Sequence, residues 1–156
     1  MTKIFSAILA VALFSHLALA ESTSFNRIKL PDPRGHQRKA VLTFSDHDQA
    51  IEIRPVKGAA VDIPYAQIDR FSYEFTRKHR IKQGAMVMAG SIPAGAIVMM
   101  TRSRSHWLEI DYRQQDLPEV CVVRMDKHDY LHILDALKTH TGKDAELLGN
   151  ADKRKK

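Results

Sequence analysis

The stretch that decides the fold is residues 106–125, HWLEIDYRQQDLPEVCVVRM. Apolar and charged residues alternate from His106 to Arg113, which predicts a β-strand with one face toward a core and the other toward solvent. Residues 114–118 predict a turn, and residues 120–125 are apolar on both faces except at Arg124, as in a strand covered on both sides. The stretch therefore predicts an antiparallel hairpin. Its inward residues would be Leu108, Ile110 and Tyr112, and its outward residues Glu109, Asp111 and Arg113.

Shorter runs of the same kind come before this hairpin. Residues 39–44 and 50–56 are apolar and β-branched, and the polar stretch between them suits a hairpin loop. A third run, residues 60–63, stops at Pro64, and alternation resumes over residues 71–76 after a corner. The chain thus contains six or seven short strands.

A helix follows the last strand. Asp126 is placed to cap it and Gly142 to end it. Between them, residues at helical spacing form one stripe: Tyr130, Ile133, Leu134, Leu137 and Thr141. Short strands followed by one amphipathic helix predict a mainly β (α+β) fold, a small antiparallel barrel with the helix over one open end.

Three segments carry a resemblance to a known family. They are the corner IPYAQI at residues 63–68 with FSYE at residues 71–74, the strand HWLEIDY at residues 106–112, and the segment 124–143. In these segments the chain resembles the bacterial pleckstrin-homology-like (PH/GRAM-like) domains of exported proteins, over about residues 38–145. The resemblance implies a PH-like barrel that serves as a binding or membrane-proximal module and not as an enzyme. Because the match falls on core positions, no ligand residue is carried over.

The two ends of the chain differ from this body in composition. Residues 1–20 read as a secretory signal, because Lys3 gives a positive start, an apolar run follows, and Ala18-Leu19-Ala20 has the form of a cleavage site. An uncleaved membrane anchor is the alternative. Residues 21–37 predict a linker or loosely docked arm, and residues 146–156 a basic disordered tail. We therefore expect an exported protein, periplasmic or membrane-associated if the source is bacterial.

Charge and cysteine content narrow the function classes. The formal net charge is +6, from 24 Lys and Arg against 18 Asp and Glu. Four of the basic residues lie in the last six positions, which argues against a nucleic-acid partner. The single cysteine, Cys121, allows no disulfide within the chain, so the core must hold the fold even in an oxidising compartment.

Residues 83–101 do not fit a plain barrel, because they carry no charge and include four of the six methionines. Gly90 and Pro93 near the centre favour a reversal over a continuous helix. We predict an apolar hairpin insertion that dips into a membrane, with its basic flanks on anionic headgroups. The predicted membrane or partner contacts are Met86, Val87, Met88, Ile92, Ile97, Val98, Met99, Met100 and Trp107. The predicted headgroup contacts are Arg77, Lys78, Arg80, Lys82, Arg102 and Arg104.

Other interpretations of this segment stay open. The hairpin could pack against the protein itself, form the seam of a homodimer, bind a protein partner, or span a membrane, although basic residues on both sides disfavour spanning. Trp107 could likewise be an interfacial anchor or pack on the barrel. The expected partners are therefore an anionic membrane surface, or else a protein partner or a second copy of the chain.

Catalytic and metal-binding patterns are weak. His128, His132 and Asp135 could form a ligand group on one helix, but they lie opposite the apolar stripe, where a solvated face is the simpler account. Cys121 falls in an apolar strand with no cationic neighbour apparent to activate it. Glu109 and Asp111 suit a solvated strand face better than general acid–base catalysis. We expect no catalysis, no metal and no cofactor.

Overall fold

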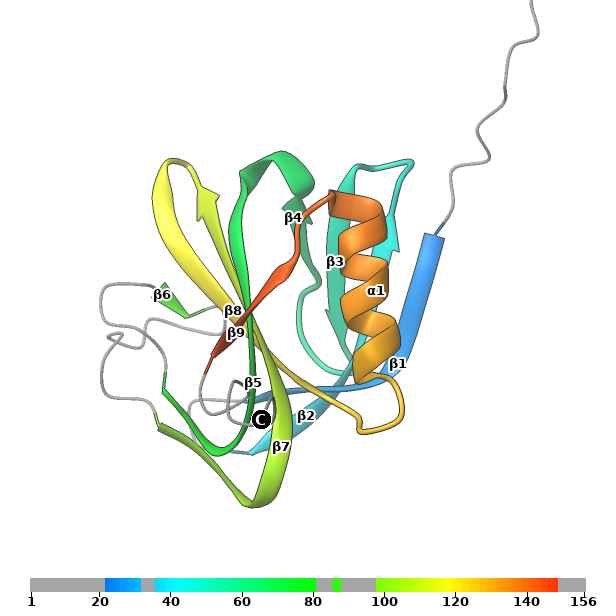
Figure 1. Ribbon diagram of the computed structural model, residues 1–156. Coiled ribbons are helices and arrows are strands. Elements are labelled where there is room, and N and C mark those ends of the chain that lie inside the picture. Colours follow the sequence, from blue (N-terminus) through cyan, green and yellow to red (C-terminus); the bar gives the residue numbers. More distant parts are fainter. Residues whose placement is uncertain (1–21, 32–35, 81–85, 88–97, 149–156) are drawn as a thin grey trace, which may run out of the picture.

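The described part of the chain is mainly β, with one α-helix near the C-terminus (Figure 1). The computed structural model describes residues 22–31, 36–77 and 103–148, and it describes the backbone alone for residues 78–80, 86–87 and 98–102. These residues form nine strands, one 3-10 turn and one α-helix. The predicted fold class, mainly β (α+β) with a C-terminal helix, is confirmed.

The first layer is an antiparallel meander of four strands: β1 (Ser22–Pro31), β2 (Gln37–Ser45), β3 (Ala50–Pro55) and β4 (Val61–Pro64). The predicted hairpin is confirmed in β2 and β3, where Phe44 lies opposite Ile51 and both side chains are fully buried. The predicted corner after Pro64 is the 3-10 turn η1 (Tyr65–Gln67).

The second layer contains three long antiparallel strands: β5 (Ile68–Arg80), β7 (Val98–Gln114) and β8 (Leu117–Met125). The turn between β7 and β8 places Gln115 and Asp116 in the left-handed region, at φ 52° and 63°, as a two-residue hairpin turn requires. This is the predicted hairpin. Residues 120–123 of β8 are all buried, so the strand is covered on both faces as expected.

The strands form one bent, open sheet in the order β4-β3-β2-β1-β8-β7-β5-β9. Its two layers join where β1 meets β8, through the single register pair Lys29 and Arg124. Two short strands add parallel pairings: β6 (Met86–Val87) lies beside β8, and β9 (Ala145–Leu148) beside β5. These additions, together with β1, explain why the strand number exceeds six or seven.

β1 corrects the prediction of a linker or arm at residues 21–37. Over Ser22–Pro31 the chain is a full strand of the meander, and Ile28 is 1% exposed in the core. The register of β1 shifts between Phe25 and Ile28. The bulge places these two residues on the core side although they are three apart, so the sequence lacks the period of two that marks a strand.

β9 corrects the prediction of a disordered tail beginning at residue 146. Residues 145–148 pair in parallel with residues 71–74 of β5, and Ala145 packs against the core. A four-residue strand at a sheet edge carries too few apolar residues to be recognised from periodicity alone. Residues 149–156 lie outside the described residues.

The C-terminal helix α1 (Tyr130–Thr141) follows its prediction closely at both faces. The prediction that Asp126 caps the helix is wrong, because α1 begins after Asp129. Asp126 belongs to the preceding turn, in which its carbonyl accepts the backbone N–H groups of Asp129 and Tyr130. Gly142 ends the helix with φ 68°, a conformation that glycine adopts without strain. Ile133, Ala136 and Leu137 are buried, whereas His132 and Asp135 are exposed.

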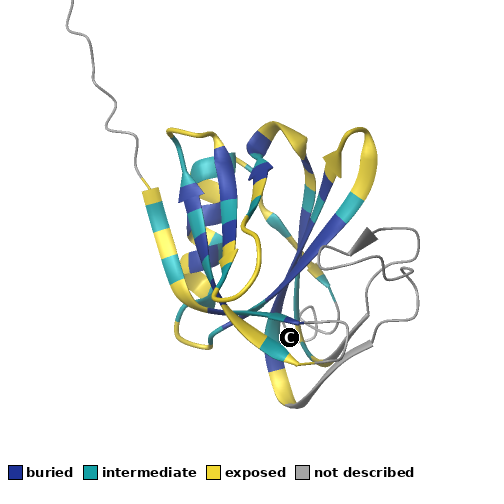
Figure 2. Cartoon of the chain, turned by 180° about the vertical axis from the view of Figure 1, so that it is seen from behind, coloured by how far each residue is buried: buried dark blue, intermediate teal, exposed yellow. Residues whose placement is uncertain are grey.

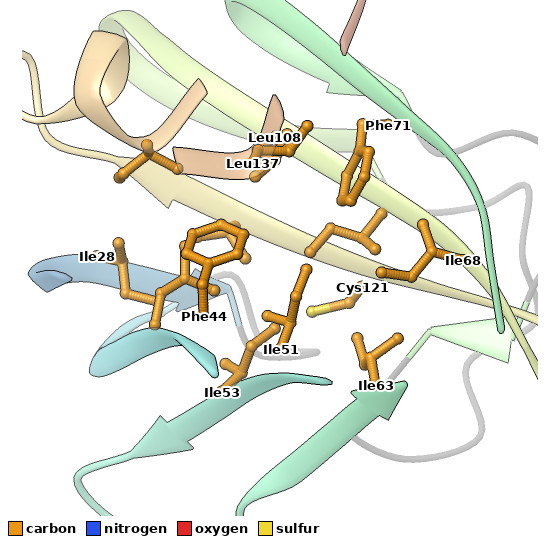
Figure 3. Close-up of a cluster of buried hydrophobic side chains, with 14 of the residues drawn as sticks. Ile28, Phe44, Ile51, Ile53, Ile63, Ile68, Phe71, Leu108, Cys121 and Leu137 are labelled. Carbon is orange, nitrogen blue, oxygen red and sulfur yellow. The ribbon is translucent and has the colours of Figure 1, made fainter. Parts of the chain in front are cut away.

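The core lies between the two layers and under α1. Figure 3 shows side chains from the meander, the second layer and the helix converging on one cluster, among them Phe44, Phe71, Leu108, Cys121 and Leu137. Seen from behind, buried residues run along the strands and exposed residues gather at the connections (Figure 2). This core holds the fold without a disulfide, because Cys121 is a free, buried thiol.

Among the residues that the structure describes, no helix has the length and apolar character needed to cross a membrane.

Candidate functional site

The predicted basic flanks meet at the base of the hairpin formed by β5 and β7. Thr76 pairs with Ser105, and Arg77 and Arg104 are the next residues on the two strands, at the point where the register shifts. Both arginines are exposed. Beyond a register shift, Lys78 pairs with Met100 and Arg80 with Val98, so the two flanks return to the same side as predicted.

Only the backbone is described for some of the predicted contact residues. Met86 and Val87 form β6 beside Glu119 and Val120 of β8, and Val98, Met99, Met100 and Arg102 belong to β7. The side chains of these residues, and those of Lys78 and Arg80, lie outside the described part of the structure, as do Lys82, Met88, Ile92 and Ile97 entirely.

Trp107 is not an interfacial anchor in this structure. Its side chain is 0% exposed, and its indole Nε1 donates a hydrogen bond to the carbonyl oxygen of Thr76 at 3.2 Å. A fully buried ring cannot reach headgroups, so the prediction of Trp107 as a membrane or partner contact is wrong and the packed alternative holds.

Glu109 corrects the prediction of a uniformly solvated outer face on β7. It is 1% exposed and lies on the same strand face as Trp107, whereas Arg113 farther along is exposed and donates to Asp69 at 3.0 Å. Asp111 accepts a hydrogen bond from Arg70 at 2.9 Å. This bond raises the pKa of Arg70, with smaller contributions from the charges of Glu146 and Glu109.

Three cations form a row across the junction of the two layers. Lys39 of β2 lies opposite Lys29 of β1, and Lys29 lies opposite Arg124 of β8. Residues directly opposite each other in a sheet share a face, and like charges in such positions destabilise the fold. With Arg77 and Arg104 they make up the set that we call the basic surface: Lys29, Lys39, Arg77, Arg104 and Arg124.

A cavity of about 310 Å³ opens beside this row. Its walls come from β1, the end of β5, the middle of β7, the end of β8, and the turn before α1. Five of its lining residues are basic: Arg27, Lys29, Arg104, Arg124 and Lys127. Lys29, Arg104 and Arg124 of the basic surface therefore line this cavity. Of these three residues, the sequence predicted only Arg104 as part of a binding surface.

The carboxylates near the cavity compensate one side of it. Arg27 donates from Nε to Asp129 at 2.8 Å and makes a second contact with the same carboxylate. Asp126 is the one acidic residue among the described lining residues. The backbone N–H of His128 donates to Asp126 and, together with the charge of Arg27, lowers the pKa of that carboxyl. Within the described part of the chain, Lys29, Arg104 and Arg124 have no carboxylate partner.

An aromatic stack forms one wall of the cavity. The His106 ring lies 3.8 Å from the Tyr130 ring and 4.5 Å from the Phe75 ring, measured between centroids. Tyr73 Oη and His106 Nδ1 are hydrogen-bonded at 2.7 Å. Burial lowers the pKa of His106, so the imidazole is neutral at pH 7. The same cause raises the pKa of Tyr73 to about 12. The stack is therefore an uncharged wall, with Phe75 41% exposed.

The weak metal-binding and catalytic patterns of the sequence find little support in the described residues. No cluster of three potential metal ligands occurs among the described residues, and His128 and His132 are exposed. Burial raises the pKa of the Cys121 thiol to about 12, which keeps it protonated and inert.

A second histidine cluster joins the end of α1 to the meander. His140 Nδ1 lies 2.7 Å from Asp46 Oδ1, and its Nε2 lies 3.0 Å from Thr23 Oγ1. The order hydroxyl, imidazole, carboxylate is that of a hydrolase triad. The His140 side chain is only 4% exposed, however, and it stacks on Phe44. Neither of the two described cavities borders it. This cluster joins α1 to the sheet. The spacing of residues 23, 46 and 140 in the sequence does not predict it.

The chain matches no protein-family model, and the comparison with curated proteins finds no match. Among solved structures, a chain in the structure of the Spt16D Pob3N heterodimer is similar, with a TM-score of 0.45 and 14% sequence identity. The similarity covers 82% of this chain and 54% of that chain. This chain thus spans about half the length of that chain.

Proposed function

We propose that this protein is an exported, bacterial pleckstrin-homology-like module without catalytic activity, which binds an anionic membrane surface through its basic surface. The hairpin of β5 and β7 would lie at or in the membrane, with Arg77 and Arg104 at headgroup level. Binding would be reversible and dependent on ionic strength, because it rests on exposed charges.

One observation carries the proposal: the basic flanks of the hairpin and the row of Lys39, Lys29 and Arg124 adjoin in the fold, although they come from five strands. Arg104 and Arg124 line one cavity together with Lys29, and Arg77 and Arg104 each follow the paired residues Thr76 and Ser105 toward the end of the hairpin. Each basic residue near an anionic membrane contributes about 1 kcal/mol. The five together therefore suit a weak, surface-directed interaction.

The second candidate is a soluble periplasmic protein-interaction domain that uses the apolar segment as a partner or self-association surface. The pairing of β6 with β8 favours it, because Met86 and Val87 there run along the sheet. A self-associating protein would elute as a dimer in size-exclusion chromatography without lipid. A concentration-independent monomer would count against this candidate.

Co-sedimentation with vesicles tests the membrane proposal. We expect the purified protein to pellet with phosphatidylglycerol-containing vesicles at low salt, and not with phosphatidylcholine alone. The variant Lys39→Gln/Arg77→Gln removes two charges of the basic surface that do not line the cavity, and it should pellet less.

A matched control removes two exposed arginines elsewhere. Arg54 and Arg113 pair with Glu52 and Asp69, so Arg54→Gln/Arg113→Gln changes the net charge equally and should pellet like the parent. Equal losses in both double variants, or equal binding to neutral vesicles, would contradict a localised anionic contact.

A further inference from the structure

The cavity beside the row of cations has the size of a small-ligand site. At about 310 Å³ it lies at the lower end of the range for small-molecule pockets. It therefore suits a headgroup or a small metabolite better than an extended polymer. Its lining comes from four strands and one turn, so the packed sheet holds it in place.

The positive charge of the cavity is only partly balanced. Asp129 neutralises Arg27, and Asp126 lies in the turn beside Lys127. Lys29, Arg104 and Arg124 line the cavity without a carboxylate partner among the described residues, and Lys29 and Arg124 are direct cross-strand neighbours. An anion held between these side chains would remove a repulsion that the fold otherwise tolerates.

The uncharged wall adds a second kind of contact. Phe75 and His106 line the cavity beside the cations, and Tyr73 and Tyr130 hold the imidazole in position through a hydrogen bond and a stack. In the described part of the structure His106 Nε2 has no hydrogen-bond partner, so it remains available to a ligand. A ligand with an anionic end and an uncharged body would use both walls.

We infer that this cavity binds a phosphate group, with Lys29, Arg104 and Arg124 around its oxygens and the uncharged body of the phosphate ester against Phe75 and His106. Arginine and lysine are the side chains that recognise phosphate, through charge-assisted hydrogen bonds. The phosphate group belongs either to a lipid headgroup or to a soluble ester. This inference shares three residues of the basic surface with the proposed function and rests on it only in that respect. It would also hold if the ligand were a soluble ester.

Titrations of the full chain monitored by amide NMR shifts test the inference. Inorganic phosphate and glycerol 3-phosphate should shift amides of residues 103–106 and 124–127, and the ester should bind more tightly because it also contacts the uncharged wall. In Lys29→Gln/Arg124→Gln we expect binding weaker by on the order of tenfold for each contact removed. The control Arg113→Gln/Lys138→Gln loses the same charge away from the cavity and should bind as the parent does.

Vesicles distinguish the two sources of phosphate. If the source is a lipid, phosphatidic acid vesicles should displace glycerol 3-phosphate, and phosphatidylcholine vesicles should not. If it is a soluble ester, neither should displace it while the cavity shifts persist. Shifts that are absent, spread over the surface, or unchanged in Lys29→Gln/Arg124→Gln would overturn the inference. Vesicle binding lost in Lys39→Gln/Arg77→Gln but kept in Lys29→Gln/Arg124→Gln would leave the membrane proposal intact and reject the phosphate cavity.

Discussion

Two histidine clusters in this protein contain the same kinds of interaction but differ in their role. His140 stacks on Phe44 and has both ring nitrogens occupied, by Asp46 and Thr23. His106 stacks on Tyr130 and Phe75, but only its Nδ1 has a partner among the described residues. The His106 cluster opens onto a cavity with unpaired cations, whereas the His140 cluster is closed. Polar residues alone therefore do not mark a site; the space and the unbalanced charge beside them do.

The largest effect is expected at the closed cluster. His140→Ala removes a buried ring, its stack on Phe44 and two hydrogen bonds, and should lower the free energy of unfolding by about 2–4 kcal/mol. Urea denaturation measures this loss. The exposed His132 on the same helix is the control, and His132→Ala should change stability little. Equal effects of the two substitutions would refute the structural role of His140.

A smaller effect is expected from Thr23→Val, which keeps the shape of the side chain and removes the hydroxyl. His140 Nε2 then loses its partner in a buried place, which costs about 1–2 kcal/mol. Because Thr23 does not line the cavity, phosphate titrations of this variant should match those of the parent. Ser24→Ala, at an exposed neighbouring position, serves as the control.

The pH dependence of stability tests the environment of His106. Burial lowers its folded pKa below the ordinary value of 6.5. The unfolded chain therefore binds a proton first as the pH falls, and stability present above pH 6.5 is lost progressively below it. In His106→Gln this contribution is absent, so stability should fall less between about pH 7 and pH 5. A slope identical to that of the parent would contradict the lowered pKa.

The smallest effect concerns the row of cations. Lys29→Gln relieves repulsion with both Lys39 and Arg124 and should stabilise the protein by about 0.2–1 kcal/mol at low salt, with the gain shrinking as salt is added. Thermal unfolding at two ionic strengths measures it. If saturating phosphate is present, the sign should reverse, because the parent then gains a ligand that the variant binds poorly. A loss of stability in phosphate-free, low-salt buffer would show that Lys29 makes a favourable contact instead.

Local patterns in the sequence predicted the parts of the fold that local physics determines. Alternation marked β2, β3 and the hairpin of β7 and β8, and helical spacing marked α1. β1 was missed because a bulge breaks its period, and β9 because it is short and pairs in parallel at an edge. Trp107 and Glu109 were misjudged because alternation assumes one solvated face, and this face of β7 is buried at these two residues, although it is exposed at Arg113.

The site was harder to predict than the fold. Arg77 and Arg104 were found because they flank an unusual apolar segment. Lys29, Lys39 and Arg124 come together only through strand register, and no spacing along the chain indicates that residues 29 and 124 are neighbours. The cavity likewise depends on how five elements pack, which a single sequence does not reveal.

The measurement that tests the central claim most directly is amide hydrogen exchange of the purified protein with and without anionic vesicles. The account predicts added protection at residues 103–106 and 124–127 beside the open cluster. It predicts no change at residues 44–46 and 137–141, around the closed one. Protection centred on the closed cluster, or none at the cavity while the protein is bound to vesicles, would contradict it.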